Sequence, residues 1–188
     1  MDIRKAGLDD IETLTELRLA YLRERAPGLS ATAAKSIAER CRDFFRRRLP
    51  ANGLVAMLGE ADGQAVSTAF MVLSERPANP DCPDGRVGVI MNVYTHPAHR
   101  RRGHSTAVVS RIVDEARAMG ISALDLLAAG AAALLYEKVG FEPAGYSAMR
   151  MRLRGKEAPR QSASTPLCGT GGMTDRFLAR EKRRCGRS

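Results

Sequence analysis

Residues 93–106, VYTHPAHRRRGHST, join an apolar, β-prone run to a run with helical spacing. Three arginines and one glycine stand at this junction: Arg100, Arg101, Arg102 and Gly103. The first backbone N–H groups of a helix have no partner inside the helix, and they carry the positive end of its dipole. A strand that ends in a glycine-containing turn and opens into a helix therefore makes an anion site. The stretch predicts a turn that holds a phosphate or pyrophosphate.

The composition indicates a globular protein: 188 residues, of which 44% are hydrophobic, suffice for one domain with a sizeable core. No apolar run approaches the roughly 20 residues that span a bilayer. The first residues, MDIRKAGLDDIE, lack the apolar region of a signal peptide. The cysteines are scattered without CxxC spacing, which argues against a disulfide or zinc framework and favours the reducing cytoplasm; they are Cys41, Cys82, Cys168 and Cys185.

The net charge of +9 is unevenly distributed. Residues 155–188 hold eight Lys or Arg and three Asp or Glu, so this segment carries +5 and residues 1–154 carry +4. The segment is also poor in large apolar residues and rich in Ser, Thr, Gly and Pro, which predicts a basic, disordered tail. We therefore expect one folded domain over 1–154. Nucleic acid is not a favoured partner, although binding through the tail stays open as a hypothesis.

The hydrophobic pattern predicts an α/β domain with the order β-α-α-β-β-β-turn-α-β-α-β. The predicted strands cover residues 2–5, 54–60, 65–73, 87–95, 121–128 and 146–153. The predicted helices cover 8–25, 30–48, 104–119 and an alanine-rich stretch that ends at Gly140. The turn ADGQ at 61–64 predicts a hairpin, and Gly120 is placed to end the third helix.

Two common phosphate-binding patterns do not fit this chain. A dinucleotide fold needs G-x-G-x-x-G after the first strand, whereas here Gly103 stands alone in a turn at mid-chain. The P-loop pattern G-x-x-x-x-G-K-[ST] is absent from the sequence. The phosphate therefore belongs to another kind of nucleotide-bearing cofactor.

Two blocks of sequence resemble the GNAT superfamily of N-acetyltransferases. Residues 92–121, NVYTHPAHRRRGHSTAVVSRIVDEARAMGI, resemble the family's acetyl-CoA motif [Q/R]-x-x-G-x-[G/A], with Arg100, Gly103 and Ser105 at its defined positions. Residues 134–151, LLYEKVGFEPAGYSAMRM, resemble its second block, in which a tyrosine precedes a Gly-Phe pair. The resemblance covers about residues 1–154. It implies a mixed, mostly antiparallel central sheet with helices on both faces.

The resemblance also implies how acetyl-CoA binds, as a co-substrate and without a metal. The backbone amides from Arg101 to Thr106, which include those of Arg102, Gly103, His104 and Ser105, would cradle the pyrophosphate. Gly103 would let the chain approach the phosphates without a Cβ atom in the way. The strand end Val93, Tyr94 and Thr95 would pair with the pantetheine amides as an added strand does. A backbone N–H of this strand would polarise the thioester carbonyl.

Tyr136 is the candidate catalytic residue. By resemblance it lies near the cofactor sulfur and would protonate the leaving thiolate as a general acid; a tyrosine that only packs the last helix is the alternative. The general base that would take the amine proton is not identified. Glu75, Asp125 and Glu142 are possible, and their spacing selects none of them.

The three histidines lie within nine residues, yet a metal site is disfavoured because no Cys or acidic ligand falls within that run; they are His96, His99 and His104. The chain departs from the family at Ser105, where Gly or Ala is usual. It departs again over 128–133, AAGAAA, where Ala129 stands at a position that often holds asparagine.

The leading hypothesis is thus an N-acetyltransferase with direct transfer from acetyl-CoA to a small-molecule or peptide amine in a ternary complex. The alternative is an acyl-CoA-binding or regulatory domain with weak catalysis, which the alanine-rich stretch suggests. A homodimer is possible, no membrane partner is expected, and the sequence does not identify the acceptor.

Overall fold

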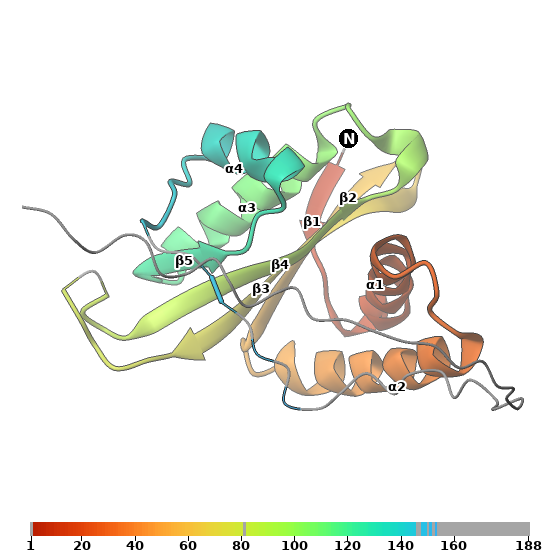
Figure 1. Cartoon of the computed structure of the whole chain (residues 1–188), viewed down its shortest axis with the longest axis horizontal. Helices are drawn as coiled ribbons and strands as arrows, with labels where there is room; N and C mark the ends of the chain where they lie inside the picture. Colours follow the sequence, from red (N-terminus) through yellow and green to blue (C-terminus); the bar gives the residue numbers. More distant parts are fainter. Residues whose placement is uncertain (1, 81, 146–147, 150, 152, 154–188) are drawn as a thin grey trace, which may run out of the picture. The chain divides into compact units, whose positions relative to one another are not determined.

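The structure is a computed structural model that describes residues 2–80, 82–145, 148, 149, 151 and 153. Met1–Ala148 form one compact unit (Figure 1). Its strands are β1 (Asp2–Lys5), β2 (Leu54–Ala61), β3 (Gln64–Glu75), β4 (Arg86–Thr95) and β5 (Ala123–Leu126). Its helices are α1 (Ile11–Arg25), α2 (Ala31–Arg48), α3 (His104–Ala118) and α4 (Ala133–Val139), with single 3-10 turns at Leu8–Asp10, Pro97–His99 and Gly130–Ala132.

The strands form one mixed sheet in the order β1-β2-β3-β4-β5. The first three pairings are antiparallel, and β5 lies parallel to β4. The β2–β3 hairpin turns at Asp62 and Gly63, whose φ angles of 52° and 75° fit the paired positive φ of a type I′ turn. The parallel pair is joined through α3, as a parallel connection requires. The mixed, mostly antiparallel sheet that the sequence predicted is confirmed.

Helices cover both faces of this sheet: α1 and α2 lie on one face, and α3 and α4 on the other (Figure 1). Alternate residues of β2 divide between the two cores, because side chains of a strand point to opposite faces. Leu54 and Ala56 pack with the α1 and α2 side chains. Val55 and Met57 pack with α3, and all four are fully buried. Each helical layer thus has its own core.

Polar side chains and a glycine mark several helix ends. Ser30 caps α2 through its Oγ, which accepts a hydrogen bond from the Ala33 N–H at 3.2 Å. At the start of the first helical segment, the Asp10 carboxylate accepts the Gly7 N–H at 2.8 Å. Gly140 follows α4 with a φ of 100°, the left-handed conformation that commonly ends a helix.

The C-terminal part departs from the prediction. β5 covers only Ala123–Leu126 of the expected 121–128, and it is paired with β4 over that whole length. Of the strand expected over 146–153, the described residues Ala148, Met149, Met151 and Leu153 lie in no strand. The rest of that segment and the predicted tail over 155–188 lie outside the described residues.

Two further observations bear on the sequence predictions. Cys41 and Cys82 carry free thiols, and Cys168 and Cys185 lie outside the described residues. Within the part of the chain that the structure describes, no helix has the length and apolar character needed to cross a membrane.

Candidate functional site

The site begins where β4 and β5 stop pairing. Their ladder runs from Val87 opposite Ala123 to Ile90 opposite Leu126 and ends there. β4 continues for five more residues, Met91 to Thr95, and among the described residues it pairs only with β3 over that stretch. The other edge of this part of β4 is therefore open (Figure 1). An extended ligand can pair with such an edge through backbone hydrogen bonds.

A bulge in β4 lies just beyond its last pair with β5. The register between β3 and β4 shifts after Thr68, and Asn92 adopts a φ of 54° on the bulged strand. Asparagine tolerates this left-handed conformation better than most residues. The Asn92 side chain is buried, and its Oδ1 accepts a hydrogen bond from Arg18 Nη1 at 2.9 Å. The bulge thus ties β4 to α1.

The anion site predicted from the sequence has the geometry it needs. Gly103 is the N-cap of α3 with a φ of 83°, and the first helical bond runs from the Ala107 N–H to the Gly103 carbonyl at 3.0 Å. The N–H groups of His104, Ser105 and Thr106 donate to no acceptor among the described residues. They remain available for a bound anion.

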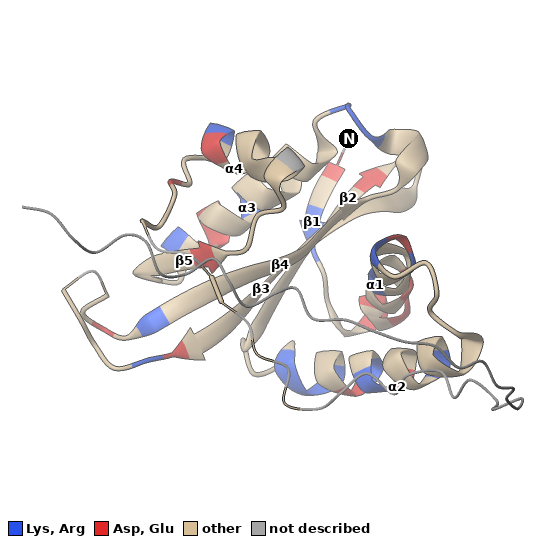
Figure 2. Cartoon of the chain, viewed as in Figure 1, with Lys and Arg blue, Asp and Glu red and all other residues tan. Residues whose placement is uncertain are grey.

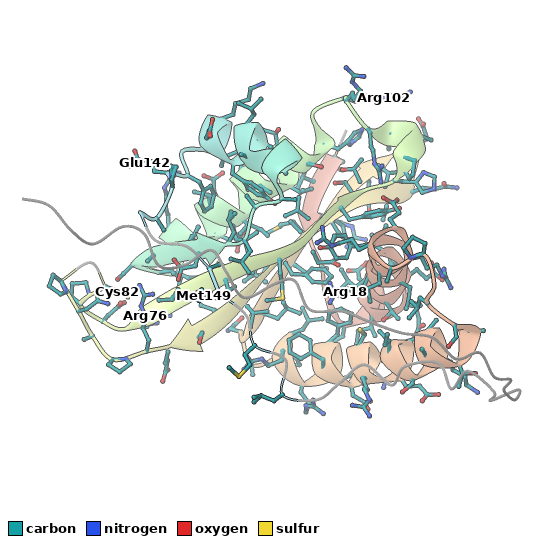
Figure 3. All side chains as sticks on the ribbon, in the orientation of Figure 1. Arg18, Arg76, Cys82, Arg102, Glu142 and Met149 are labelled. Atoms are coloured by element: carbon teal, nitrogen blue, oxygen red, sulfur yellow. The ribbon has the colours of Figure 1, made fainter. Side chains whose placement is uncertain are left out.

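The three arginines before this helix differ in their roles. Figure 2 shows them as a basic stretch in the loop that leads into α3, and Figure 3 shows Arg102 at its tip, directed away from the sheet. Arg101 is exposed and has a φ of 62°. The Arg100 side chain instead folds back: its Nε donates to the Thr95 carbonyl at 3.0 Å, and its Nη2 donates to Glu24. Arg100 thus braces the end of β4 against α1.

A chain of hydroxyl groups fixes the first turn of α3 to the sheet. Ser67 Oγ donates to the Tyr94 carbonyl at 3.0 Å and lies 2.8 Å from Thr95 Oγ1. Thr95 Oγ1 lies in turn 2.8 Å from Ser105 Oγ. Glycine or alanine at position 105 could not make this contact. The serine that departs from the family motif therefore links the open strand to the helix N-terminus.

The histidines pack together at the base of the same loop. The His96 and His99 rings lie 6.1 Å apart, and the His99 and His104 rings lie 6.0 Å apart, both edge to face. His104 is buried, and burial, followed by the charges of His99 and Arg102, lowers the pKa of its imidazole. Among the described residues, no three His, Cys, Asp or Glu side chains form a group that could hold a metal ion.

Tyr136, the predicted general acid, lies on α4. Its ring packs edge to face on Phe141, with 6.0 Å between the ring centroids. Burial raises the pKa of its phenol, and the charge of Tyr21 raises it further. Tyr21 belongs to α1, on the other face of the sheet.

A cavity of about 470 Å³ adjoins Tyr136. Its walls come from β5, from α4 and from the segment after α4, and none of them belongs to β4. Leu124, Leu126 and Phe141 give it an apolar lining. It therefore lies beside β5, and its lining includes Tyr136 and no residue of β4.

Two of the three acidic candidates for a general base, Asp125 and Glu142, line this cavity together with Tyr136, whereas Glu75 lies elsewhere. Glu75 pairs with Arg86 at the start of β4, five residues before Met91 and hence about 16 Å from the open stretch along the strand. Asp125 forms an ion pair with Arg76 at 3.3 Å. Glu142 is exposed at the cavity wall (Figure 3).

The alanine-rich stretch forms the turn between β5 and α4. Ala129 is exposed, and its carbonyl accepts the Ala132 N–H at 2.7 Å. Its methyl side chain offers no hydrogen bond where asparagine is frequent in the family. The backbone of the turn is nevertheless ordered into a 3-10 turn over Gly130–Ala132.

Sequence reasoning missed Arg18 and Asn92, which meet at the bulge. A signal existed for Asn92, because asparagine is depleted in strands and here interrupts the apolar run VGVIMNVYT. Nothing in the local pattern of α1 distinguished Arg18 from the other arginines of that helix.

Comparisons with known proteins agree with this geometry. The Acetyltransferase (GNAT) family matches residues 14–141. A predicted acetyltransferase from Clostridium acetobutylicum, solved with acetyl-CoA, is 28% identical, with a TM-score of 0.68 over 79% of this chain and 95% of that one. A GCN5-related N-acetyltransferase from Ralstonia eutropha JMP134 is 26% identical, with a TM-score of 0.67 over 80% and 97%. No curated protein matches the sequence.

An acetyltransferase from Trypanosoma brucei is also similar, at 27% identity and a TM-score of 0.58 over 81% of this chain and 99% of that one. These similarities extend along nearly the whole of the solved proteins. The family match covers most of the chain, including β4, the anion-binding turn, α3 and the tyrosine of α4. The chain belongs to the GNAT family of acetyltransferases, enzymes that transfer an acyl group from acetyl-CoA.

Proposed function

We propose that this protein is an N-acetyltransferase that transfers the acetyl group of acetyl-CoA directly to a primary amine, with both substrates bound at once. One observation carries the proposal: the open edge of β4 leads straight to the unpartnered N–H groups of α3. A single extended ligand with an amide-containing arm and a pyrophosphate matches both features.

In this proposal, the donor supplies the acetyl thioester. The N–H groups from Arg101 to Thr106 hold its pyrophosphate, and the exposed side chains of Arg101 and Arg102 add positive charge. Val93, Tyr94 and Thr95 supply backbone groups for the pantetheine arm. Arg100 acts indirectly, because its guanidinium holds the Thr95 carbonyl and Glu24.

The acceptor amine, once deprotonated, attacks the thioester carbonyl and forms the new C–N bond. The C–S bond then breaks, and the thiolate takes a proton from the Tyr136 hydroxyl. The Tyr136 phenol is protonated at neutral pH, as a general acid must be, and burial raises its pKa above the ordinary value. A backbone N–H of β4 near the bulge would stabilise the oxyanion of the tetrahedral intermediate. No acidic side chain is assigned as the base.

The test is the release of free thiol from acetyl-CoA with a panel of primary amines, together with the affinity for CoA measured by calorimetry. We expect CoA binding and amine-dependent thiol release. Tight binding of acetyl-CoA without turnover over a broad panel would favour the alternative, an acyl-CoA-binding domain with weak catalysis. Absence of both binding and turnover would contradict both functions.

A further inference from the structure

Among the described residues, Arg18 on α1 bonds to the sheet without an ion pair, as does Arg48 on α2, which donates to the Leu73 carbonyl at 3.4 Å. Two other arginines that contact α1 have a carboxylate partner instead. Arg100 faces Glu24 and Arg42 faces Glu12, each with N–O distances below 3 Å. Arg18 donates to the neutral amide of Asn92 and lies over the Tyr21 ring, with 5.5 Å from its Cζ to the ring centroid. It forms no ion pair with any described residue.

The other neighbour of Arg18 does not compensate the charge. Cys41 on α2 lies close to the guanidinium, yet burial raises the pKa of its thiol. The thiol is therefore neutral at pH 7 and supplies no anion. A half-buried guanidinium without a carboxylate is costly, because burial removes water that would otherwise solvate the charge.

The guanidinium keeps donors that a ligand can reach. Its bond to Asn92 uses one of five N–H groups. No Arg18 nitrogen is both buried and without a partner, so the remaining donors reach solvent-accessible space. Asn92, in contrast, has a buried Nδ2 that finds no acceptor among the described residues. Two donor groups thus lie side by side at the bulge without an anionic partner.

These donors lie at the opening where transfer would take place. Asn92 is the second residue of β4 beyond its last pair with β5. Figure 3 shows Arg18 between α1 and the sheet, on the face opposite α3. Met91, next to the bulge, is 41% exposed although it lies in a central strand, so this part of the sheet is accessible.

We propose that Arg18, supported by Asn92, selects acceptor amines that carry a carboxylate. This inference rests on the proposed function and adds its substrate class. Guanidinium and carboxylate match in charge and in planar geometry, so the pair forms strong, directional hydrogen bonds. The acceptor carboxylate occupies the α1 side of the opening, while the cofactor occupies the open edge of β4 and the N-terminus of α3. The amine then lies beside the bulge, next to the open edge of β4.

The experiment compares matched pairs of amines in the thiol-release assay. Glycine, β-alanine, 4-aminobutyrate, alanine and phenylalanine are each tested against their own carboxamides. For at least one pair, wild-type kcat/KM should favour the acid by about tenfold or more, the scale of a charge-assisted hydrogen bond. In Arg18→Gln the ratio of acid to amide should fall by about tenfold or more, and Arg18→Lys should restore part of it. Dividing the variant's ratio by the wild-type ratio cancels the difference in amine basicity.

Arg23→Gln is the matched control, because Arg23 is exposed on the same helix. It removes the same charge and should leave the acid preference unchanged. If Arg18→Gln slows acids and amides equally, Arg18 only supports the bulge, and the inference is overturned while the proposed function stands.

If no amine is turned over, the proposed function fails, and the inference is then judged by binding. The same acids and amides are titrated into the protein saturated with CoA. Acids that bind at least about tenfold more tightly than their amides, with the difference lost in Arg18→Gln, support the carboxylate site. Equal binding of acids and amides overturns it.

Discussion

The guanidinium of Arg100 donates to both carboxylate oxygens of Glu24, at 2.7 and 2.6 Å, and joins the anion-binding loop to α1. The same guanidinium holds the Thr95 carbonyl at the end of β4. Hydrogen bonding to Glu24 raises the pKa of Arg100, which keeps it charged at every working pH. Arg100, the first defined position of the acetyl-CoA motif, thus holds the loop in place through the contacts of its side chain with Glu24 and the Thr95 carbonyl.

Breaking this pair should loosen the loop with little loss of stability. Both side chains are more than 40% exposed, and such pairs contribute about 0–1 kcal/mol to the free energy of unfolding. Glu24→Gln should weaken CoA binding by a factor of about five or less, because a fivefold change in affinity corresponds to about 1 kcal/mol. A double-mutant cycle with Arg100→Gln, followed by calorimetry with CoA, measures the coupling. Additive effects of the two substitutions on CoA affinity would show that the pair does not support the loop.

Ser105→Ala tests the hydroxyl chain from Ser67 through Thr95 to α3. The substitution removes one hydrogen bond and should lower the free energy of unfolding by about 1 kcal/mol. The backbone N–H of residue 105 remains, so the affinity for CoA should change little. Ser110→Ala, on the same helix, is the control and should not destabilise the protein. Chemical denaturation measures the free energy of unfolding, and calorimetry measures the affinity for CoA. A large loss of CoA affinity in Ser105→Ala would mean that the hydroxyl binds the cofactor.

Gly103→Ala separates backbone strain from ligand binding. Gly103 and Gly63 have similar φ angles of 83° and 75°, and a Cβ atom would meet no neighbour at either position. Each Gly→Ala change should therefore cost about 1–2 kcal/mol of stability, the cost of a left-handed alanine. Only Gly103→Ala should also weaken CoA binding, because Gly63 lies in the β2–β3 turn and not at the N-terminus of α3, although both lie toward the same end of the sheet. Equal CoA affinity in the two variants would remove Gly103 from the site.

The turn before α3 was predictable because its signals are local. The transition from β-prone to helical spacing located this turn, and α3 follows it and is buried at Val108, Ile112 and Ala116. From the sequence, Gly103 was explained by the room that a missing Cβ atom leaves for the phosphates, and this explanation was incomplete. Its surroundings are open, and its positive φ is the requirement that the structure reveals.

The opening itself was not predictable, because it depends on where two distant strands stop pairing. β4 and β5 each have β-prone sequence beyond Ile90 and Leu126, and only their register ends the ladder there. The Arg18–Asn92 contact spans 74 positions of sequence. Likewise, residues 146–153 alternate between apolar and polar, but such a segment forms a strand only where a sheet edge pairs with it. The described residues of that segment lie in no strand.

Tyr136→Phe tests the general acid. Phenylalanine keeps the ring that packs on Phe141 but removes the only proton the side chain can give. We expect kcat to fall by about 100-fold or more, with KM for acetyl-CoA nearly unchanged, since general acids contribute on that scale. Steady-state kinetics with the best amine of the panel provides both constants. If turnover persists at the wild-type rate, Tyr136 only packs α4 and the proton comes from elsewhere.

His104 should make the stability of the protein depend on pH. Burial lowers the pKa of its imidazole below the ordinary value of 6.5, so the folded state holds it neutral. Below about pH 6.5 the unfolded chain binds a proton that the folded chain resists, and the free energy of unfolding therefore falls as the pH falls through that value. Denaturation between about pH 7.5 and pH 5.5 should show this loss in the wild type and a smaller loss in His104→Gln. The exposed His96, changed to Gln, is the matched control and should keep the wild-type pH dependence. Equal losses in His104→Gln and the wild type would mean that another group governs the effect.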